Sequence, residues 1–202
     1  MGYFKEDVDP LVLRAFSDFL LQLGRMGLAV EDADFRGVDE ALQEFYPIRR
    51  AEATAFHMRW LQTCPELYGE DVRRLLELGK EVPAIDYVAA QNSRPSLIDK
   101  FVSSMKGFDA MAVPCTSTTA PVIGQETVTV SERTIDVYTA LNRLTLPFNV
   151  AGFPALSIPI GQVGGLPVGA QLVARPFEES TLLALGDAYE KEIGPYPVPK
   201  GR

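Results

Sequence analysis

The sequence predicts an α/β protein with a mixed sheet and helices on both faces of that sheet. Two apolar segments, residues 155–160 and 168–173, have the length of strands and are joined by a short Gly/Pro connector, so we expect adjacent strands. Both alternating sets of side chains in these segments are apolar, which is typical of strands covered on both faces. Segments with helical periodicity alternate with these and other short apolar runs, a pattern typical of layered α/β packing.

The first predicted helix begins at Asp9-Pro10, because aspartate is a good N-cap and proline fits the first helical position. Gly24 and Gly27 end this helix, and residues 28–30 have the composition of a short buried strand. The apolar stripe that faces the core is predicted to consist of Leu13, Phe16, Leu20 and Leu23.

Three further helices are predicted before the next strand. Residues 39–64 are expected to be helical in two pieces, because Pro47 lacks the N–H that a continuous helix requires. A shorter helix begins after Gly69 and ends at Gly79. A long helix then covers residues 83–105.

The second half of the chain contains the predicted strands. Residues 111–113 form a strand, a loop rich in Pro, Thr and Gly extends to about residue 132, and residues 134–144 are helical. The strand pair follows, and residues 180–190 form the last helix. With no internal repeat and no linker, residues 1–202 are expected to form a single domain with a loosely ordered, Pro-rich tail at 193–202.

Composition excludes several classes of protein. The net charge of −8 and the lack of a basic stretch argue against binding to nucleic acid. No apolar run approaches the roughly 20 residues of a membrane span, and the N-terminus does not have the apolar, basic pattern of a signal peptide. The two cysteines, Cys64 and Cys115, are expected to be free thiols. We therefore expect a cytoplasmic protein that binds neither nucleic acid nor membrane.

Residues 114–124 are the candidate binding loop, because loops that follow sheet strands are where α/β proteins bind ligands. The alternative is a solvent-exposed loop whose hydroxyls cap the neighbouring backbone. The small hydrogen-bonding side chains of this loop include Cys115, Thr116, Thr118 and Thr119.

No catalytic residue is predicted in this chain. Ser103-Ser104 and Lys106 are interpreted as an exposed polar helix end, since no glycines near them could expose backbone N–H groups to an oxyanion. His57 is the single histidine, and no G-x-S-x-G turn accompanies it, which argues against a Ser-His-Asp triad. One histidine and two cysteines distant in sequence form no zinc signature, so no metal and no cofactor is expected.

Residues 149–176, NVAGFPALSIPIGQVGGLPVGAQLVARP, closely resemble the C-terminal signature of the amidase signature family. The resemblance continues through FDAMAVPCTSTTAPVIG (108–124) and FEESTLLALGDAYEK (177–191), and covers most of the chain from about Gly2 to Gly194. It implies the C-terminal part of a three-layer α/β/α fold, and an activity in which a serine cleaves or transfers amides. The family uses a lysine, a serine in a cis peptide bond and a nucleophilic serine in a Gly/Ser-rich run; this sequence contains no such run.

The resemblance also suggests which residues lie near a substrate. It places the loop 114–124 beside the substrate cavity, Arg73-Arg74 near its entrance, and Asn142-Arg143 just before the Pro147-Phe148-Asn149 motif. The substrate-cavity candidates from these last two pairs are Arg74, Asn142 and Arg143, with surface or salt-bridging roles as the alternative. In the glutamine-using branch an acidic residue is expected close to position 142, and its absence argues against a glutamine donor.

Three functions follow as hypotheses. The first is the C-terminal portion of an amidase-type C–N hydrolase, which contributes scaffold and part of the substrate cavity, is inactive alone, and meets a small amide substrate only in the complete enzyme. The alternative is a non-catalytic truncated relative that binds a small molecule or a protein; an independent enzyme that uses unrecognised residues is a third.

Apolar strands with nothing beside them favour association. The expected partner is a second copy, as a homodimer, or an N-terminal-half amidase polypeptide, with an interface above about 1,000 Å². The alternative is that the first helix covers the open edge.

Overall fold

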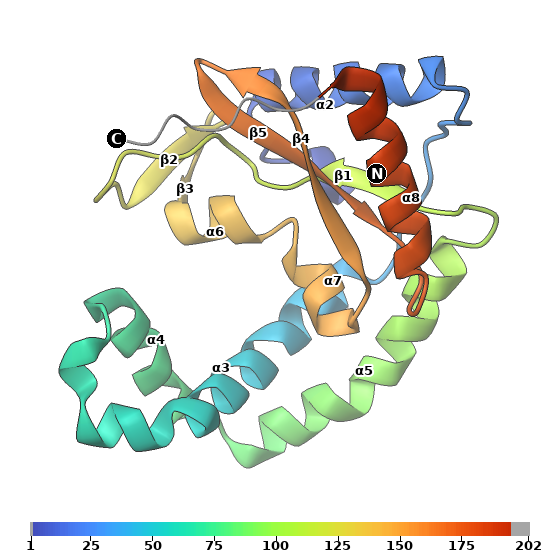
Figure 1. The fold of residues 1–202 in the computed structure, drawn as a ribbon. Helices are drawn as coiled ribbons and strands as arrows, with labels where there is room; N and C mark the ends of the chain where they lie inside the picture. The colour runs from blue at the N-terminus through green and yellow to red at the C-terminus, as the bar shows by residue number, and fades with distance from the viewer. Residues whose placement is uncertain (1, 195–202) are drawn as a thin grey trace. The chain divides into compact units, whose positions relative to one another are not determined.

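The computed structural model describes residues 2–194 and contains helices and two antiparallel sheets (Figure 1). The contacts divide the chain into two compact units, one drawn from Met1–Phe35 and Val102–Arg202 and the other formed by Arg36–Phe101. The single domain expected from the sequence stays a prediction, because two compact units can still unfold together. Most of the tail expected to be loosely ordered, residues 195–202, lies outside the described residues.

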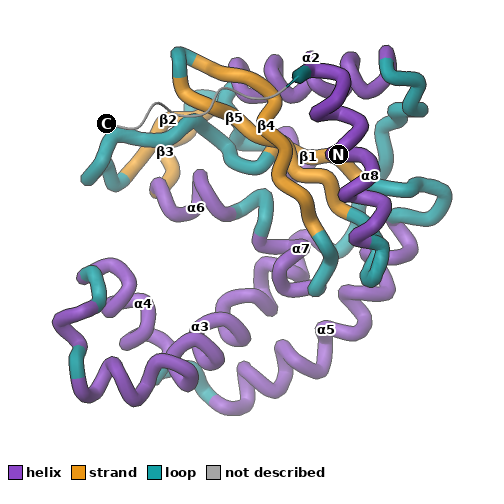
Figure 2. The backbone as a smooth tube through the Cα atoms, in the orientation of Figure 1, coloured by secondary structure: helices purple, strands orange, loops and turns teal. Residues whose placement is uncertain are grey.

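The main sheet belongs to the first unit and is ordered β1-β5-β4. Its strands, orange in Figure 2, are β1 (Met111–Pro114), β4 (Ala155–Val163) and β5 (Leu166–Val173). All pairings between them are antiparallel. Ala155 lies opposite Val173 and Val163 opposite Leu166, so the predicted adjacency of residues 155–160 and 168–173 is confirmed. Gly164 and Gly165 make the turn with φ of 58° and 80°, a conformation that glycine adopts without strain.

One face of this sheet is covered by α2 (Pro10–Arg25) and α8 (Glu179–Ile193). The Phe19 and Tyr189 rings meet edge to face, with centroids 5.0 Å apart. The fully buried positions of α2 are Val12, Phe16, Phe19 and Leu23, and Leu20 is partly buried against the same core, so three of the four predicted positions face the core and Leu13 does not belong to it. Val12 and Leu13 have equally good spacing, and the contact between Phe19 and α8 selects Val12. The buried core on this face consists of Phe16, Phe19, Leu23, Ile158, Ala170, Leu172, Ala174, Leu182 and Tyr189.

The start of α2 is as predicted. The Asp9 side chain accepts a hydrogen bond from the Leu11 N–H at 2.7 Å, and Pro10 occupies the first turn. The short buried strand predicted for residues 28–30 is wrong: this segment is irregular, and Leu28 and Val30 are 36% and 44% exposed. A strand requires a hydrogen-bonded neighbour, and no strand of the described residues pairs with this segment.

A second correction concerns the predicted loop to residue 132 and the predicted helix at 134–144. The structure has a hairpin of β2 (Thr127–Val130) and β3 (Arg133–Asp136). Its turn residues Ser131 and Glu132 both have positive φ, as in two-residue hairpin turns. Helix α6 (Val137–Asn142) begins only after Asp136, which caps it by accepting from the Thr139 N–H at 2.8 Å. Two short helices complete the first unit, α1 (Gly2–Lys5) and α7 (Leu146–Ala151).

The second unit is helical. Helix α3 (Val38–Thr63) is continuous through Pro47, so the predicted break is wrong. Burial of Phe45 and Ile48 on either side of the proline offsets the one helical hydrogen bond that is lost. A 3₁₀ turn, η1 (Pro65–Leu67), leads to α4 (Glu70–Gly79), and α5 (Ala84–Ser104) is the predicted long helix, whose last turn belongs to the first unit. No helix of the described residues has the length and apolar composition to cross a membrane.

Candidate functional site

The face of the sheet opposite α2 and α8 includes several small and polar side chains beside the buried Val113 and Val173. Side chains alternate along a strand, so Ser157 lies on this face while Ile158 faces the core. Gln171 lies directly opposite Ser157 in the register, and Gly169 is two residues before it. Cys115 follows β1, and its Sγ lies 3.4 Å from the Ser157 Oγ. A Cβ built on Gly169 would approach the Cys115 Sγ to 3.3 Å, so a glycine there lets the thiol reach the sheet. We call Cys115, Ser157 and Gly169 the small-residue face.

Gln171 attaches this face to the segment between α6 and α7. Its side chain is buried, and its Nε2 donates to the Leu144 carbonyl at 2.9 Å and to the Pro114 carbonyl at 3.4 Å. The Ser117 N–H donates to the Ala140 carbonyl at 2.9 Å, which attaches the candidate loop to the same region. The loop 114–124 therefore begins in a fixed position beside the small-residue face.

Within the loop, the Thr116 hydroxyl donates to the Thr118 carbonyl at 2.7 Å, and Thr118 and Thr119 are half-buried. Ser117 is fully buried, and its Oγ has no hydrogen-bond partner among the described atoms. A buried hydroxyl is ordinarily hydrogen-bonded, so this one is an open donor and acceptor next to the candidate site.

Cys115 is an unfavourable nucleophile in this setting. Burial raises the pKa of its thiol, and the hydrogen bond with Ser157 opposes that shift without reversing it. The thiol is therefore neutral at physiological pH, and only the thiolate reacts readily. Cys115 therefore contributes a small, uncharged side chain to the small-residue face.

This protonation state gives the first testable prediction. Because the charged form is disfavoured, alkylation of Cys115 by iodoacetamide should be slower than that of glutathione at pH 7.5 and should rise steeply only above about pH 9. Ser157→Ala removes the opposing hydrogen bond and should slow the reaction further. Mass analysis after digestion separates Cys115 from Cys64. Rapid labelling of Cys115 at pH 7 would contradict the neutral thiol.

In the structure, two of the other candidates, Asn142 and Arg143, make local structural contacts. Arg143 is buried, and its guanidinium donates to the Glu6 carbonyl at 2.6 Å and to the Tyr3 carbonyl at 3.1 Å. It also lies over the Tyr3 ring, 4.2 Å from the centroid. Asn142 donates to the Tyr138 carbonyl at 2.7 Å. Arg74 is exposed on α4 of the other unit.

Sequence reasoning missed Ser157, Gly169 and Gln171, although a signal was present. Each is a small or polar residue inside an otherwise apolar strand, and such residues need a partner or a function there. Residues 2–194 contain no cluster of three or more His, Cys, Asp or Glu side chains placed to hold a metal ion. His57 lies in the second unit, with its Nδ1 2.9 Å from the Tyr68 hydroxyl.

The fold is that of an amidase-type α/β protein. The profile of the protein family described as Amidase matches residues 1–183, and the chain belongs to that family, which confirms the resemblance found in the sequence. A crystal structure of an amidase superposes with a TM-score of 0.86 at 29% identity, over 95% of this chain and 44% of that one. The fold is therefore confirmed as part of an α/β/α amidase fold.

Two curated relatives show how the chain compares with whole proteins. It is 35% identical to an amidase of Pseudomonas putida, over 94% of this chain and 41% of the relative. It is 31% identical to one component of the glutamyl-tRNA(Gln) amidotransferase of Lawsonia intracellularis, over 98% of this chain and 45% of the relative. The chain thus spans less than half the length of these relatives.

Proposed function

We propose that this chain is the C-terminal portion of an amidase-type C–N hydrolase and that it is inactive without the remaining portion. The observation that carries the proposal is the small-residue face. This face combines a neutral thiol, an exposed serine and a glycine on a sheet. The chain also matches less than half of the length of the Pseudomonas putida amidase, which leaves room for the catalytic residues in the rest of such an enzyme. A face of this kind can line a substrate cavity but holds no activated nucleophile.

In this proposal, the two portions of the amidase have different roles in catalysis. The activated serine and its lysine base belong to the remaining portion, as the family resemblance implies. This chain contributes the scaffold and one wall of the cavity, formed by the Ser157 hydroxyl, the Cys115 thiol and the loop 114–124. Small side chains leave room for a substrate between the two portions, and neutral groups suit a small amide, which carries no charge at the bond to be cleaved.

The exposure of β4 on this side of the sheet supports the same division. Ala155, Ser157 and Pro159 are all exposed on β4, whereas Ile158 on the opposite face is buried. A sheet whose second face is covered by another polypeptide would show this asymmetry when that polypeptide is absent.

The test uses the part of the Pseudomonas putida amidase that this chain does not match, produced as a separate polypeptide. The mixture of the two should hydrolyse a simple amide such as benzamide. Ser157→Trp fills the space above the small-residue face and should lower kcat/KM of the mixture about tenfold or more, because it displaces the substrate from the reactive geometry. The exposed Leu183→Trp on α8 adds the same bulk on the other side of the sheet and should leave the rate unchanged. Equal rates for both variants would contradict a substrate cavity on this face.

A further inference from the structure

Residues 2–9, which we call the N-terminal strap, contact the elements that carry the candidate site. The Arg143 guanidinium, just after α6, donates to the strap carbonyls of Glu6 at 2.6 Å and Tyr3 at 3.1 Å. The Tyr3 hydroxyl donates in return to the Arg143 carbonyl at 2.8 Å. Hydrogen bonds from a charged donor are stronger than neutral ones. The strap and the residue after α6 are therefore firmly joined.

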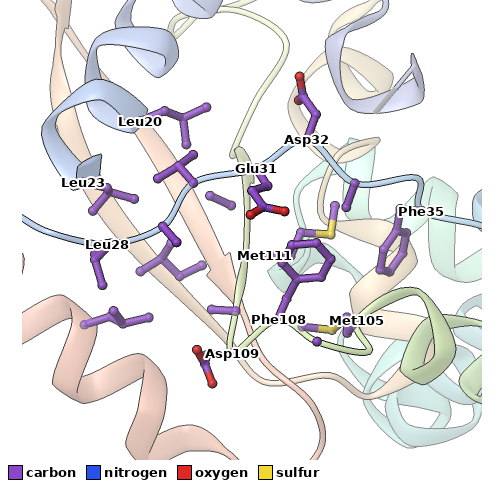
Figure 3. A pocket seen from close by; sticks show the side chains of 18 of the residues that line it. Leu20, Leu23, Leu28, Glu31, Asp32, Phe35, Met105, Phe108, Asp109 and Met111 are labelled. Carbon is purple, nitrogen blue, oxygen red and sulfur yellow. The ribbon is translucent and has the colours of Figure 1, made fainter. Parts of the chain in front are cut away.

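An aromatic cluster holds the strap to α7 as well. Phe4 of the strap is 1% exposed, and its ring stacks on that of Phe148 in α7 with centroids 5.4 Å apart. Phe35, which also lines the pocket shown in Figure 3, packs against both rings, with centroids 6.0 Å from Phe4 and 5.8 Å from Phe148. The segment between α6 and α7 is thus held to the strap on both sides, by Arg143 and by Phe148.

This segment orients the buried amide of the candidate site. Leu144 follows Arg143, and its carbonyl accepts from the Gln171 Nε2 at 2.9 Å. Gln171 lies opposite Ser157 in the register of the sheet, and its Nε2 also lies 3.4 Å from the Pro114 carbonyl. A displacement of Arg143 therefore moves the acceptor that holds Gln171 beside the small-residue face.

The strap also holds the candidate binding loop directly. The Asp9 N–H donates to the Ser117 carbonyl at 2.7 Å, and the Ser117 N–H donates to the Ala140 carbonyl of α6 at 2.9 Å. Cys115 lies between this anchor and Pro114, whose carbonyl accepts from the buried amide. Both anchors are linked to the strap, so the accessibility of the Cys115 thiol should respond to changes in it.

We propose that Arg143 is a positioning residue of the substrate cavity: through the N-terminal strap it fixes the small-residue face and the loop 114–124 beside the substrate, an inference that rests on the proposed function. Arg143 acts through its neighbours and not on the substrate. It keeps this wall of the cavity in place relative to the reactive serine of the remaining portion, and a displacement of about 1 Å can lower a rate about a hundredfold. An arginine with a structural role alone would change the stability of the unit but not the geometry of the folded site.

The test is Arg143→Lys, which keeps the positive charge but lacks the planar, forked donor that reaches both carbonyls. In the free chain, alkylation of Cys115 by iodoacetamide at pH 7.5 should become about fivefold faster or more, because the loop opens more often. In the mixture with the remaining portion of the Pseudomonas putida amidase, kcat per serine labelled by a fluorophosphonate should fall about tenfold, with KM changed less than about twofold.

A milder variant keeps the inference testable if Arg143→Lys fails to fold. Tyr3→Phe removes only the hydroxyl that donates to the Arg143 carbonyl and keeps the ring beside the guanidinium. It should change the alkylation rate and kcat in the same directions as Arg143→Lys, by a smaller factor. Circular dichroism establishes that each variant is folded.

Leu182→Ala is the control, because Leu182 is 3% exposed in the core on the other side of the sheet and its truncation destabilises the same unit without touching the strap. It should leave both quantities at their wild-type values. If the wild-type mixture is active and neither strap variant lowers kcat further than Leu182→Ala does, the positioning role is wrong and the proposed function stands. If the wild-type mixture is inactive while the amidase's own matching portion restores activity, the proposed function is wrong; unchanged alkylation in the strap variants would then overturn the hold of Arg143 on the loop as well.

Discussion

Purified alone, the chain is expected to hydrolyse propionamide and benzamide no faster than buffer, and mixing it with the remaining portion of an amidase should raise the rate by about a thousandfold or more. Amide cleavage needs an activated nucleophile and fixed donors for the oxyanion, and enzymes gain many orders of magnitude from them. Neither is found on the small-residue face, where the Cys115 thiol is neutral. The measurement is ammonia release at micromolar protein over several hours.

The matched variant is Ser103→Ala, Ser104→Ala and Lys106→Ala together. These residues lie where α5 ends, and the Lys106 N–H donates to the Ser103 carbonyl as part of the helix end. The triple variant should behave like the wild type, inactive alone and active in the mixture. Hydrolysis by the lone chain that this triple change abolishes would show that the serine and lysine are catalytic after all.

Arg143→Ala is expected to destabilise the first unit by about 3 kcal/mol, because hydrogen bonds from a charged donor contribute roughly 1.5–3 kcal/mol each. Arg143 as a whole is 8% exposed, and its guanidinium bonds to two backbone carbonyls, those of Tyr3 and Glu6. Its own carbonyl accepts from the Tyr3 hydroxyl at 2.8 Å, and the Tyr3 ring stacks on the guanidinium. Removing this side chain leaves the carbonyls unsatisfied and releases the N-terminal segment.

Arg133→Ala is the control, because Arg133 also bonds to the N-terminal segment, through Asp7 at 2.6 Å, but its side chain is 68% exposed. An exposed ion pair contributes about 0.5 kcal/mol. Urea unfolding of both variants, followed by circular dichroism, compares the two. If Arg143→Ala lowers the free energy of unfolding by as little as Arg133→Ala does, the contacts of Arg143 do not stabilise the fold.

The sequence predicted most elements whose signals are local. Asp9-Pro10 supplies both a cap and a first-turn residue, and the apolar runs of β4 and β5 flank a diglycine turn, so helix α2 and the strand pair were predicted correctly. The errors occur where contacts with residues distant in the sequence determine the secondary structure of a segment. Residues 28–30 have strand composition but no strand neighbour among the described residues, and Pro47 is kept within α3 by burial around it.

The candidate site was predicted less completely for the same reason. The loop 114–124 is evident from its run of small hydroxyl residues, but Ser157 and Gln171 come from strands that begin more than 30 residues later and join it only through the β4 and β5 register. Arg143 looked like a site or surface residue because the sequence alone does not reveal its bonds to Tyr3 and Glu6.

The most direct test of the central claim is the location of the reactive serine. A fluorophosphonate that labels activated serines is added to the active mixture, and the mass of each polypeptide is measured. The account predicts one label on the remaining portion of the amidase and none on this chain, together with loss of hydrolysis. A stoichiometric label on this chain would contradict it.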